Sequence, residues 1–174
     1  MARLSLVVPK VEELWFRQKC MSNPKTMAYN AGYQVSYEGY HYESGCIDFP
    51  KEKWEKWHST RLSDEDLFYA YILDEELNQF VGYVNFKINR DSGKASMGIL
   101  IDDDFRGRGY MRPALILLIE KAKEKGVKAL TDTVPKSRER ALKVFFDLGF
   151  EIEDTFYVKK FDKDDEVFAI EKKL

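Results

Sequence analysis

Residues 99–112 place glycines and arginines in the order Ile-Leu-Ile-Asp-Asp-Asp-Phe-Arg-Gly-Arg-Gly-Tyr-Met-Arg. The pattern predicts a strand, then a turn, then a long apolar helix. The first N–H groups of a helix lack partners within the helix and form the positive end of its dipole. Gly107 and Gly109 let the backbone approach a ligand, and three side chains add positive charge: Arg106, Arg108 and Arg112. The stretch therefore predicts a pyrophosphate site; the alternative is an ordinary turn with solvated arginines.

Three consecutive aspartates, Asp102, Asp103 and Asp104, stand just before this turn. They could cap the turn or hold the arginines in place. The simpler interpretation is a solvated, charged loop.

Alternating and helical apolar periodicities predict the elements that position the turn. Strands are expected at residues 4–8, 67–73, 79–88, 95–101, 127–134, 150–161 and 166–172, and helices at 11–21, 50–57, 109–125 and 136–148. Gly98, inside a strand, predicts a bulge or a close backbone approach. Residues 29–48 carry five tyrosines and predict a long loop, which either lines an acceptor pocket or pins itself to the domain. The order predicts one mixed α/β domain over residues 1–174.

Composition excludes several classes of protein. The chain is 44% hydrophobic and 33% charged, which is typical of a globular domain. A net charge of −2 gives no basic footprint for nucleic acid, and no apolar run reaches membrane-spanning length. Cys20 and Cys46 lack metal-site spacing. With no signal peptide, we expect a cytoplasmic protein with two free thiols, no metal and no membrane or nucleic-acid partner.

Two motifs in register resemble those of GNAT acetyltransferases. Residues 106–110, Arg-Gly-Arg-Gly-Tyr, resemble the acetyl-CoA loop of that superfamily. Residues 138–150, which include Arg138, Ala141 and a final Leu-Gly-Phe, resemble its second signature. Within the superfamily, residues 95–99 and 109–111 look most like the branch that acetylates the N-termini of ribosomal proteins. The resemblance implies an α/β (α+β) GNAT fold, whose mixed, mostly antiparallel sheet of six to seven strands splays in the middle and is flanked by helices.

The same resemblance implies a set of cofactor-binding residues. The backbone of the strand at Ile99 and Ile101 would pair with the pantetheine arm, and the loop amides would hold the pyrophosphate. Ser137 and Arg138 would lie by the pantetheine or the adenosine. The implied set is Ile99, Leu100, Ile101, Arg106, Gly107, Arg108, Gly109, Tyr110, Met111, Ser137 and Arg138.

The chain departs from the family pattern at several positions. Met111 replaces a small residue, and Arg138 stands where asparagine is common. Phe145 occupies the position of a tyrosine that protonates the leaving thiolate, and Ser96 that of a glutamate base. The candidates for the base are Asp132, Glu43 and His41, each of which could instead be an ordinary surface group, or a bound water; the thiolate could then leave unassisted.

These observations predict an N-acetyltransferase that moves an acetyl group from acetyl-CoA, its cosubstrate, to a primary amine within a ternary complex. The acceptor is left open among a protein N-terminus, a polyamine, an antibiotic and an amino acid, and the protein is expected to be a monomer or a homodimer. The lost tyrosine and glutamate support an alternative, a non-catalytic acyl-CoA sensor or interaction module. A third hypothesis, ATP binding at the same helix start, lacks the Gly-Lys-Ser/Thr motif.

Overall fold

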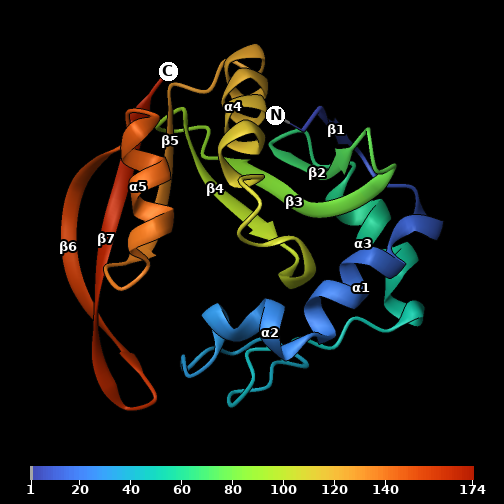
Figure 1. Cartoon of the computed structure of the whole chain (residues 1–174), viewed down its shortest axis with the longest axis horizontal. Helices are drawn as coiled ribbons and strands as arrows, with labels where there is room; N and C mark the ends of the chain where they lie inside the picture. Colours follow the sequence, from blue (N-terminus) through green and yellow to red (C-terminus); the bar gives the residue numbers. More distant parts are fainter. Residues whose placement is uncertain (1) are drawn as a thin grey trace.

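The computed structural model describes residues 2–174, whose strands form one seven-stranded sheet (Figure 1). The strands are β1 (Leu4–Val7), β2 (Leu67–Asp74), β3 (Gln79–Ile88), β4 (Lys94–Ile101), β5 (Ala129–Pro135), β6 (Glu151–Lys160) and β7 (Lys163–Lys173). Their spatial order is β1-β2-β3-β4-β5-β7-β6. Among these seven described strands only the β4–β5 pair is parallel, so the prediction of a mixed, mostly antiparallel sheet is confirmed.

Within residues 2–174, five α-helices accompany the sheet: α1 (Trp15–Ser22), α2 (Pro24–Met27), α3 (Trp54–Arg61), α4 (Met111–Glu124) and α5 (Glu139–Asp147). The helix predicted at 11–21 is divided into a 3₁₀ turn, Val11–Glu13, and α1. The prediction placed the start of α4 two residues too early, because Gly109 adopts a φ of 83° that a right-handed helix excludes. It placed the start of α5 three residues too early, because residues 136–138 form a turn in which the Arg138 N–H donates to the Pro135 carbonyl.

Strand alternation sends neighbouring side chains to opposite layers. Phe68 and Ala70 of β2 join the core that contains α4 and α5, whereas Tyr69 and Tyr71 pack with α1 and α2. On β4, the residues predicted to share one face all contact the α4–α5 core: Ala95, Met97, Ile99 and Ile101. Among residues 2–174, no helix is long and apolar enough to cross a membrane.

The sheet splits between β4 and β5. These strands pair at only three positions, from Lys94 with Ala129 to Ser96 with Thr131, and then diverge. The predicted splay is therefore present, but the bulge predicted at Gly98 is wrong, because the β3–β4 register is unbroken along β4. Gly98 instead makes room for a side chain and not for another backbone segment, since a Cβ there would lie 3.0 Å from the Asn85 side-chain nitrogen.

The loop predicted at 29–48 lies across the open side of the split. Figure 1 shows α2 and this loop below the diverging ends of β4 and β5. Tyr33 forms a β-bridge with Lys160 at the end of β6, and the Phe161 N–H donates to the Gly32 carbonyl over 2.8 Å. The N-terminal segment therefore connects the two halves of the sheet and closes one end of the split.

Candidate active site between strands β4 and β5

The outer edge of β4 presents unpaired backbone groups to the split. The Asp102 N–H donates to the Val81 carbonyl over 3.0 Å, which fixes the alternation of the β3–β4 ladder. By that alternation, the backbone of Leu100 faces β3, whereas Ile99 and Ile101 direct N–H and C=O groups toward β5. The Ile101 carbonyl accepts from Arg106 Nε at 3.1 Å. The N–H and C=O of Ile99 and the N–H of Ile101 are thus placed to pair with an extended ligand.

The predicted phosphate loop has an open backbone. Gly107 and Gly109 have φ values of 75° and 83°, and a Cβ built on either one meets nothing within 4 Å. No side chain caps the start of α4, and its third residue, Pro113, has no N–H. The N–H groups at the first turn of a 14-residue helix are therefore available to an anion.

Tyr110 anchors this loop to the protein interior. Its side chain is buried, and its hydroxyl donates to the Asp74 carboxylate over 2.6 Å. Asp74 also accepts from the N–H groups of Glu76 and Leu77, and these hydrogen bonds, with that of Tyr110 the strongest, lower the pKa of Asp74. The loop is thus fixed to the end of β2 while its glycines stay exposed.

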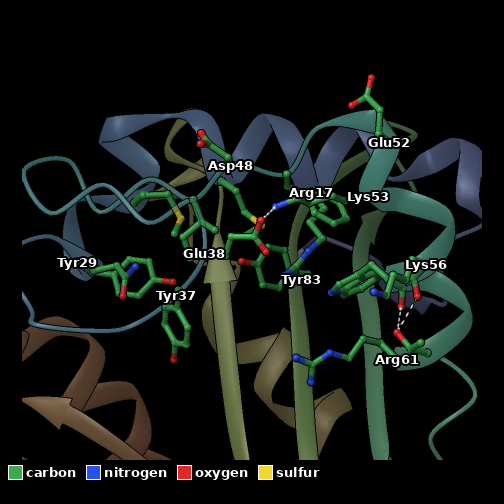
Figure 2. Close-up of a pocket in the computed structure, with 17 residues that line it drawn as sticks. Arg17, Tyr29, Tyr37, Glu38, Asp48, Glu52, Lys53, Lys56, Arg61 and Tyr83 are labelled. Carbon is green, nitrogen blue, oxygen red and sulfur yellow. Dashed lines mark hydrogen bonds and ion pairs between the residues drawn. The ribbon is translucent and has the colours of Figure 1, made fainter.

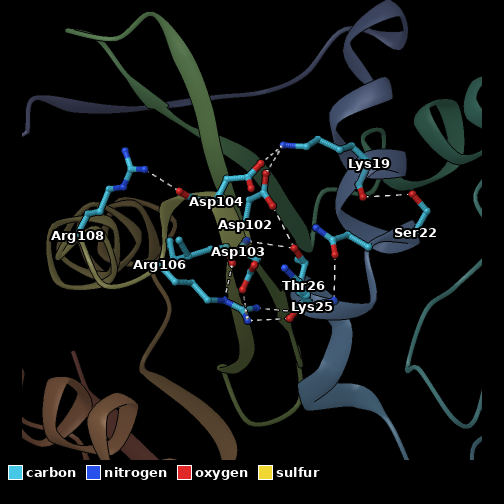
Figure 3. Close-up of polar contacts among 11 residues, drawn as sticks. Lys19, Ser22, Lys25, Thr26, Asp102, Asp103, Asp104, Arg106 and Arg108 are labelled. Carbon is cyan, nitrogen blue, oxygen red and sulfur yellow. Dashed lines mark hydrogen bonds and ion pairs between the residues drawn. The ribbon is translucent and has the colours of Figure 1, made fainter.

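A second anchor joins the loop to the N-terminal helices (Figure 3). Asp102 is fully buried and accepts from Lys19 Nζ at 2.6 Å and from the Thr26 hydroxyl at 3.0 Å. The interpretation of a solvated acidic loop is therefore wrong for Asp102. The Arg106 guanidinium donates to the carbonyls of Lys25 and Thr26, at 2.9 and 2.6 Å. We call these four groups, Lys19, Thr26, Asp102 and Arg106, the clamp.

The clamp changes the expected roles of the three loop arginines. The N–H groups of Arg106 donate to backbone carbonyls, so this side chain positions the loop. Arg108 donates to the Asp104 carbonyl at 2.9 Å, and Arg112 lies 4.0 Å from Asp147. Both side chains are exposed beside the glycines, so they are the ones that can supply charge to a phosphate.

Asp132 lies on β5 inside the split. It lines a cleft of about 440 Å³ together with Gly98, Ile99 and Leu100 of β4 and with Arg138. Its Oδ1 accepts the Thr133 N–H at 2.8 Å, which orients the carboxyl group. Burial raises the pKa of Asp132 to about 7, although the nearby Arg138 and this hydrogen bond oppose the shift. A carboxyl group with that pKa suits proton abstraction near neutral pH.

A larger cavity of about 880 Å³ adjoins the cleft (Figure 2). Four residues line both spaces: Arg17, Tyr29, Asn30 and Tyr83. Figure 2 shows Lys53, Lys56 and Arg61 along the α3 side and Tyr29 and Tyr37 on the opposite loop. Cleft and cavity thus adjoin at these residues and together extend from the split to the face covered by α1 and α3; we call the two spaces the path.

The tyrosines of the 29–48 loop have both of the roles considered from the sequence. Tyr29 and Tyr37 line the large cavity, and Tyr33 lines the cleft while donating to Asp165 at 3.2 Å. Tyr40 donates to the Asn30 carbonyl at 2.8 Å, and Tyr42 packs edge-on against Phe161. The first three face the path, and the last two hold the loop in place.

The other predicted residues fall inside or outside this path. Arg138 stacks over the Tyr29 ring at 5.5 Å and spans the cleft, and Ser137 is exposed beside it. His41 and Glu43 are exposed and line neither the cleft nor the large cavity; His41 bonds Asp48 at 2.8 Å. Phe145 is buried, packs edge-on against Phe150 and lines neither the cleft nor the large cavity.

Sequence reasoning missed Arg17, Trp57 and Tyr83 as site residues. The sequence correctly predicts a helix at Arg17 and a strand at Tyr83, but neither prediction indicates that two side chains 66 positions apart line one space. The only signal was the concentration of aromatic residues between positions 15 and 83, and that signal also describes a core.

Comparison with known proteins identifies relatives of this arrangement. Residues 31–150 match the model of the acetyltransferase (GNAT) family. Among solved structures, spermidine N-acetyltransferase from Vibrio cholerae in complex with CoA and spermine superimposes with a TM-score of 0.80 at 16% identity, over 98% of this chain and 95% of that one. An acetyltransferase of the GNAT family from Streptococcus pneumoniae gives 0.77 at 16%, over 99% and 100%. At such identities these likenesses establish the fold alone. No curated protein matches the sequence.

Proposed function

This chain belongs to the acetyltransferase (GNAT) family and is an acyltransferase, and we propose that it moves an acetyl group from acetyl-CoA to a primary amine. The matched segment covers both motifs, the loop at 106–111 and the segment at 138–150. We further propose that residues 1–174 act as one domain. Within the family, we propose that the chain is related to the branch that acetylates the N-termini of ribosomal proteins, which the resemblance at residues 95–99 and 109–111 supports.

The juxtaposition of three features carries this proposal. The open loop at the start of α4 presents N–H groups to an anion, the outer edge of β4 offers backbone groups to an extended chain, and Asp132 faces them across the cleft. A nucleoside diphosphate joined to a long polar arm fits a loop followed by a strand edge. Acetyl-CoA has that chemistry, and it supplies a thioester when bound.

The residues of the chain support direct attack by the amine. Asp132, as the carboxylate, takes the proton of the amine while the nitrogen forms a bond to the acetyl carbon. The C–S bond breaks with its electron pair on sulfur, and the thiolate takes a proton from solvent. An outward N–H of β4, such as that of Ile99, donates to the carbonyl oxygen as charge develops there. Arg138 and Tyr29 close the cleft around the reacting atoms.

Calorimetry and a turnover assay test the proposal. We expect CoA and acetyl-CoA to bind more tightly than ATP, and acetyl-CoA to release free thiol when amines are added. The panel includes a peptide with a free N-terminus, a polyamine and an amino acid. Equal or tighter binding of ATP would exclude the cosubstrate. Tight binding of acetyl-CoA without thiol release on any amine would favour the non-catalytic sensor.

A further inference from the structure

Arg17 lies where the large cavity meets the cleft. It projects from α1 and lines both spaces, as Tyr29 and Tyr83 also do. On the proposed function, an acceptor that occupies the large cavity reaches Asp132 across this junction. A charged side chain at that point therefore touches whatever group of the acceptor follows the amine.

The guanidinium of Arg17 is enclosed by aromatic rings. Its central carbon lies 4.4 Å from the ring centre of Trp57 and 5.1, 5.3 and 5.6 Å from those of Phe49, Tyr69 and Tyr83. Rings at these distances attract the cation, but they do not accept its N–H groups as a carboxylate would. One of them, on Nη1, donates to the Tyr69 hydroxyl at 3.1 Å.

The remaining donors of Arg17 lack an anionic partner. Its Nε is buried without any hydrogen-bond acceptor, and no carboxylate within residues 2–174 forms an ion pair with it. A desolvated cation without a counter-ion opposes folding, and buried polar groups are nearly always paired. An anion that arrives with a ligand would complete this site.

The charged side chains around the large cavity include a small excess of cations. Its lining carries four cations, Arg17, Lys53, Lys56 and Arg61, against three acids, Glu38, Asp48 and Glu52. Glu38 and Lys53 pair with each other at 3.4 Å, which leaves three cations against two acids, Glu52 and an Asp48 that also bonds His41 at 2.8 Å. A polycation such as spermidine needs the opposite balance of charge.

We infer that the acceptor is an amine that also carries a carboxylate, an amino acid or a compound of that class, and that Arg17 binds the carboxylate while the amine faces Asp132. The inference rests on the proposed function and names its substrate class. The carboxylate accepts the in-plane N–H groups of Arg17, and the four rings exclude water from the ion pair. Charge-assisted bonds of this kind are the stronger ones.

Matched pairs of amines test the substrate class. The wild-type enzyme is assayed with amino carboxylates of two to six carbons, with the carboxamide of each, and with spermidine. We expect kcat/KM for the best carboxylate to exceed that for its carboxamide by roughly tenfold or more. Preference for a carboxamide or for spermidine would overturn the inference while leaving the proposed function standing.

A binding measurement tests the anion site even if the protein acetylates none of these amines. Calorimetry on the CoA-loaded protein compares each amino carboxylate with its carboxamide. Preferential binding of the carboxylate without turnover supports the anion site and contradicts the proposed function. Equal binding contradicts the anion site whether or not the protein is active.

Variants then assign the preference to Arg17. We expect Arg17→Gln to bring the carboxylate-to-carboxamide ratio close to one, mainly through KM, and Arg17→Lys to restore part of it. Because both substrates are compared within one variant, a general loss of packing cancels from the ratio. Arg90→Gln, which changes an exposed arginine paired with Asp66, is the control and should keep the wild-type ratio. A full preference in folded Arg17→Gln would overturn the role of Arg17.

Discussion

The two sides of the split are built in different ways. The cofactor side uses backbone groups from one continuous stretch, residues 99–112, with positive-φ glycines and a helix start. The acceptor side collects side chains from α1, the 29–48 loop, α3 and β3. Backbone chemistry is set by local sequence, whereas a wall of side chains depends on the tertiary fold. The cofactor side should therefore respond to changes in backbone conformation, and the acceptor side to changes in charge.

The largest expected effect tests whether Asp132, on the β5 side of the split, acts as the base. We expect Asp132→Asn to lower kcat/KM by about 10²–10³-fold, because it removes the base while keeping the oxygen that accepts the Thr133 N–H. Affinity for CoA should change little. A variant with wild-type turnover would move the base to a water or to another residue.

The same residue predicts a dependence on pH. Since the carboxylate is the active form and the pKa of Asp132 is about 7, kcat/KM should rise as pH increases through that value. The folded-state pKa lies above the unfolded value of about 4, so stability is full below that pH and declines as pH rises to about 7. The Tm of Asp132→Asn should thus exceed that of the parent at pH 8, and the difference should shrink at pH 5.

A pair of glycine variants separates the loop from ordinary backbone strain. Gly109→Ala places a side chain at φ 83° in the open loop, and we expect CoA affinity to fall roughly tenfold. Gly126→Ala is the control, because its φ of 73° carries similar strain and its Cβ also meets nothing within 4 Å. Both variants should lose about 1 kcal/mol of stability. Equal CoA affinities of Gly109→Ala and Gly126→Ala would show that the loop does not bind CoA.

The clamp gives a smaller effect that connects the two sides. Lys19→Met leaves the buried Asp102 carboxylate with Thr26 as its remaining side-chain partner, and we expect the free energy of unfolding to fall by about 1–3 kcal/mol. CoA affinity should fall a few-fold, since Asp102 begins the turn that leads to the loop. Lys121→Met, which breaks an exposed pair with Glu124, should change stability by less than about 1 kcal/mol. Unchanged CoA affinity in Lys19→Met would show that the phosphate loop keeps its binding conformation without the Lys19–Asp102 ion pair.

The smallest expected effect concerns the missing tyrosine. Phe145→Tyr should leave kcat within about twofold, because the ring is only 2% exposed and packs against Phe150, so a hydroxyl there serves no leaving group. The unpaired hydroxyl should cost about 1–3 kcal/mol of stability. Phe146→Tyr, at a neighbouring side chain that is 40% exposed, should cost almost nothing. A tenfold rise in kcat for Phe145→Tyr would show that the position is catalytic.

The sequence allowed the strands and the loop glycines to be predicted because periodicity and positive-φ glycine are local properties. It misplaced the bulge at Gly98, where the space for Asn85 across the sheet explains the glycine better than a break in register. The burial of Asp102 and the cage around Arg17 could not be predicted, since both depend on α1 packing against residues more than 30 positions away. Oligomeric state and cellular location remain predictions.

The clamp has one thermodynamic consequence. Lys19 belongs to the same helix as Arg17, while its partner Asp102 begins the turn that carries the phosphate loop. If a ligand bound at Arg17 shifts α1, or a ligand bound at the phosphate loop shifts the turn, the shift also changes the affinity of the other site through the Lys19–Asp102 ion pair. Linkage then requires that the acceptor strengthen cosubstrate binding by the same factor by which the cosubstrate strengthens acceptor binding.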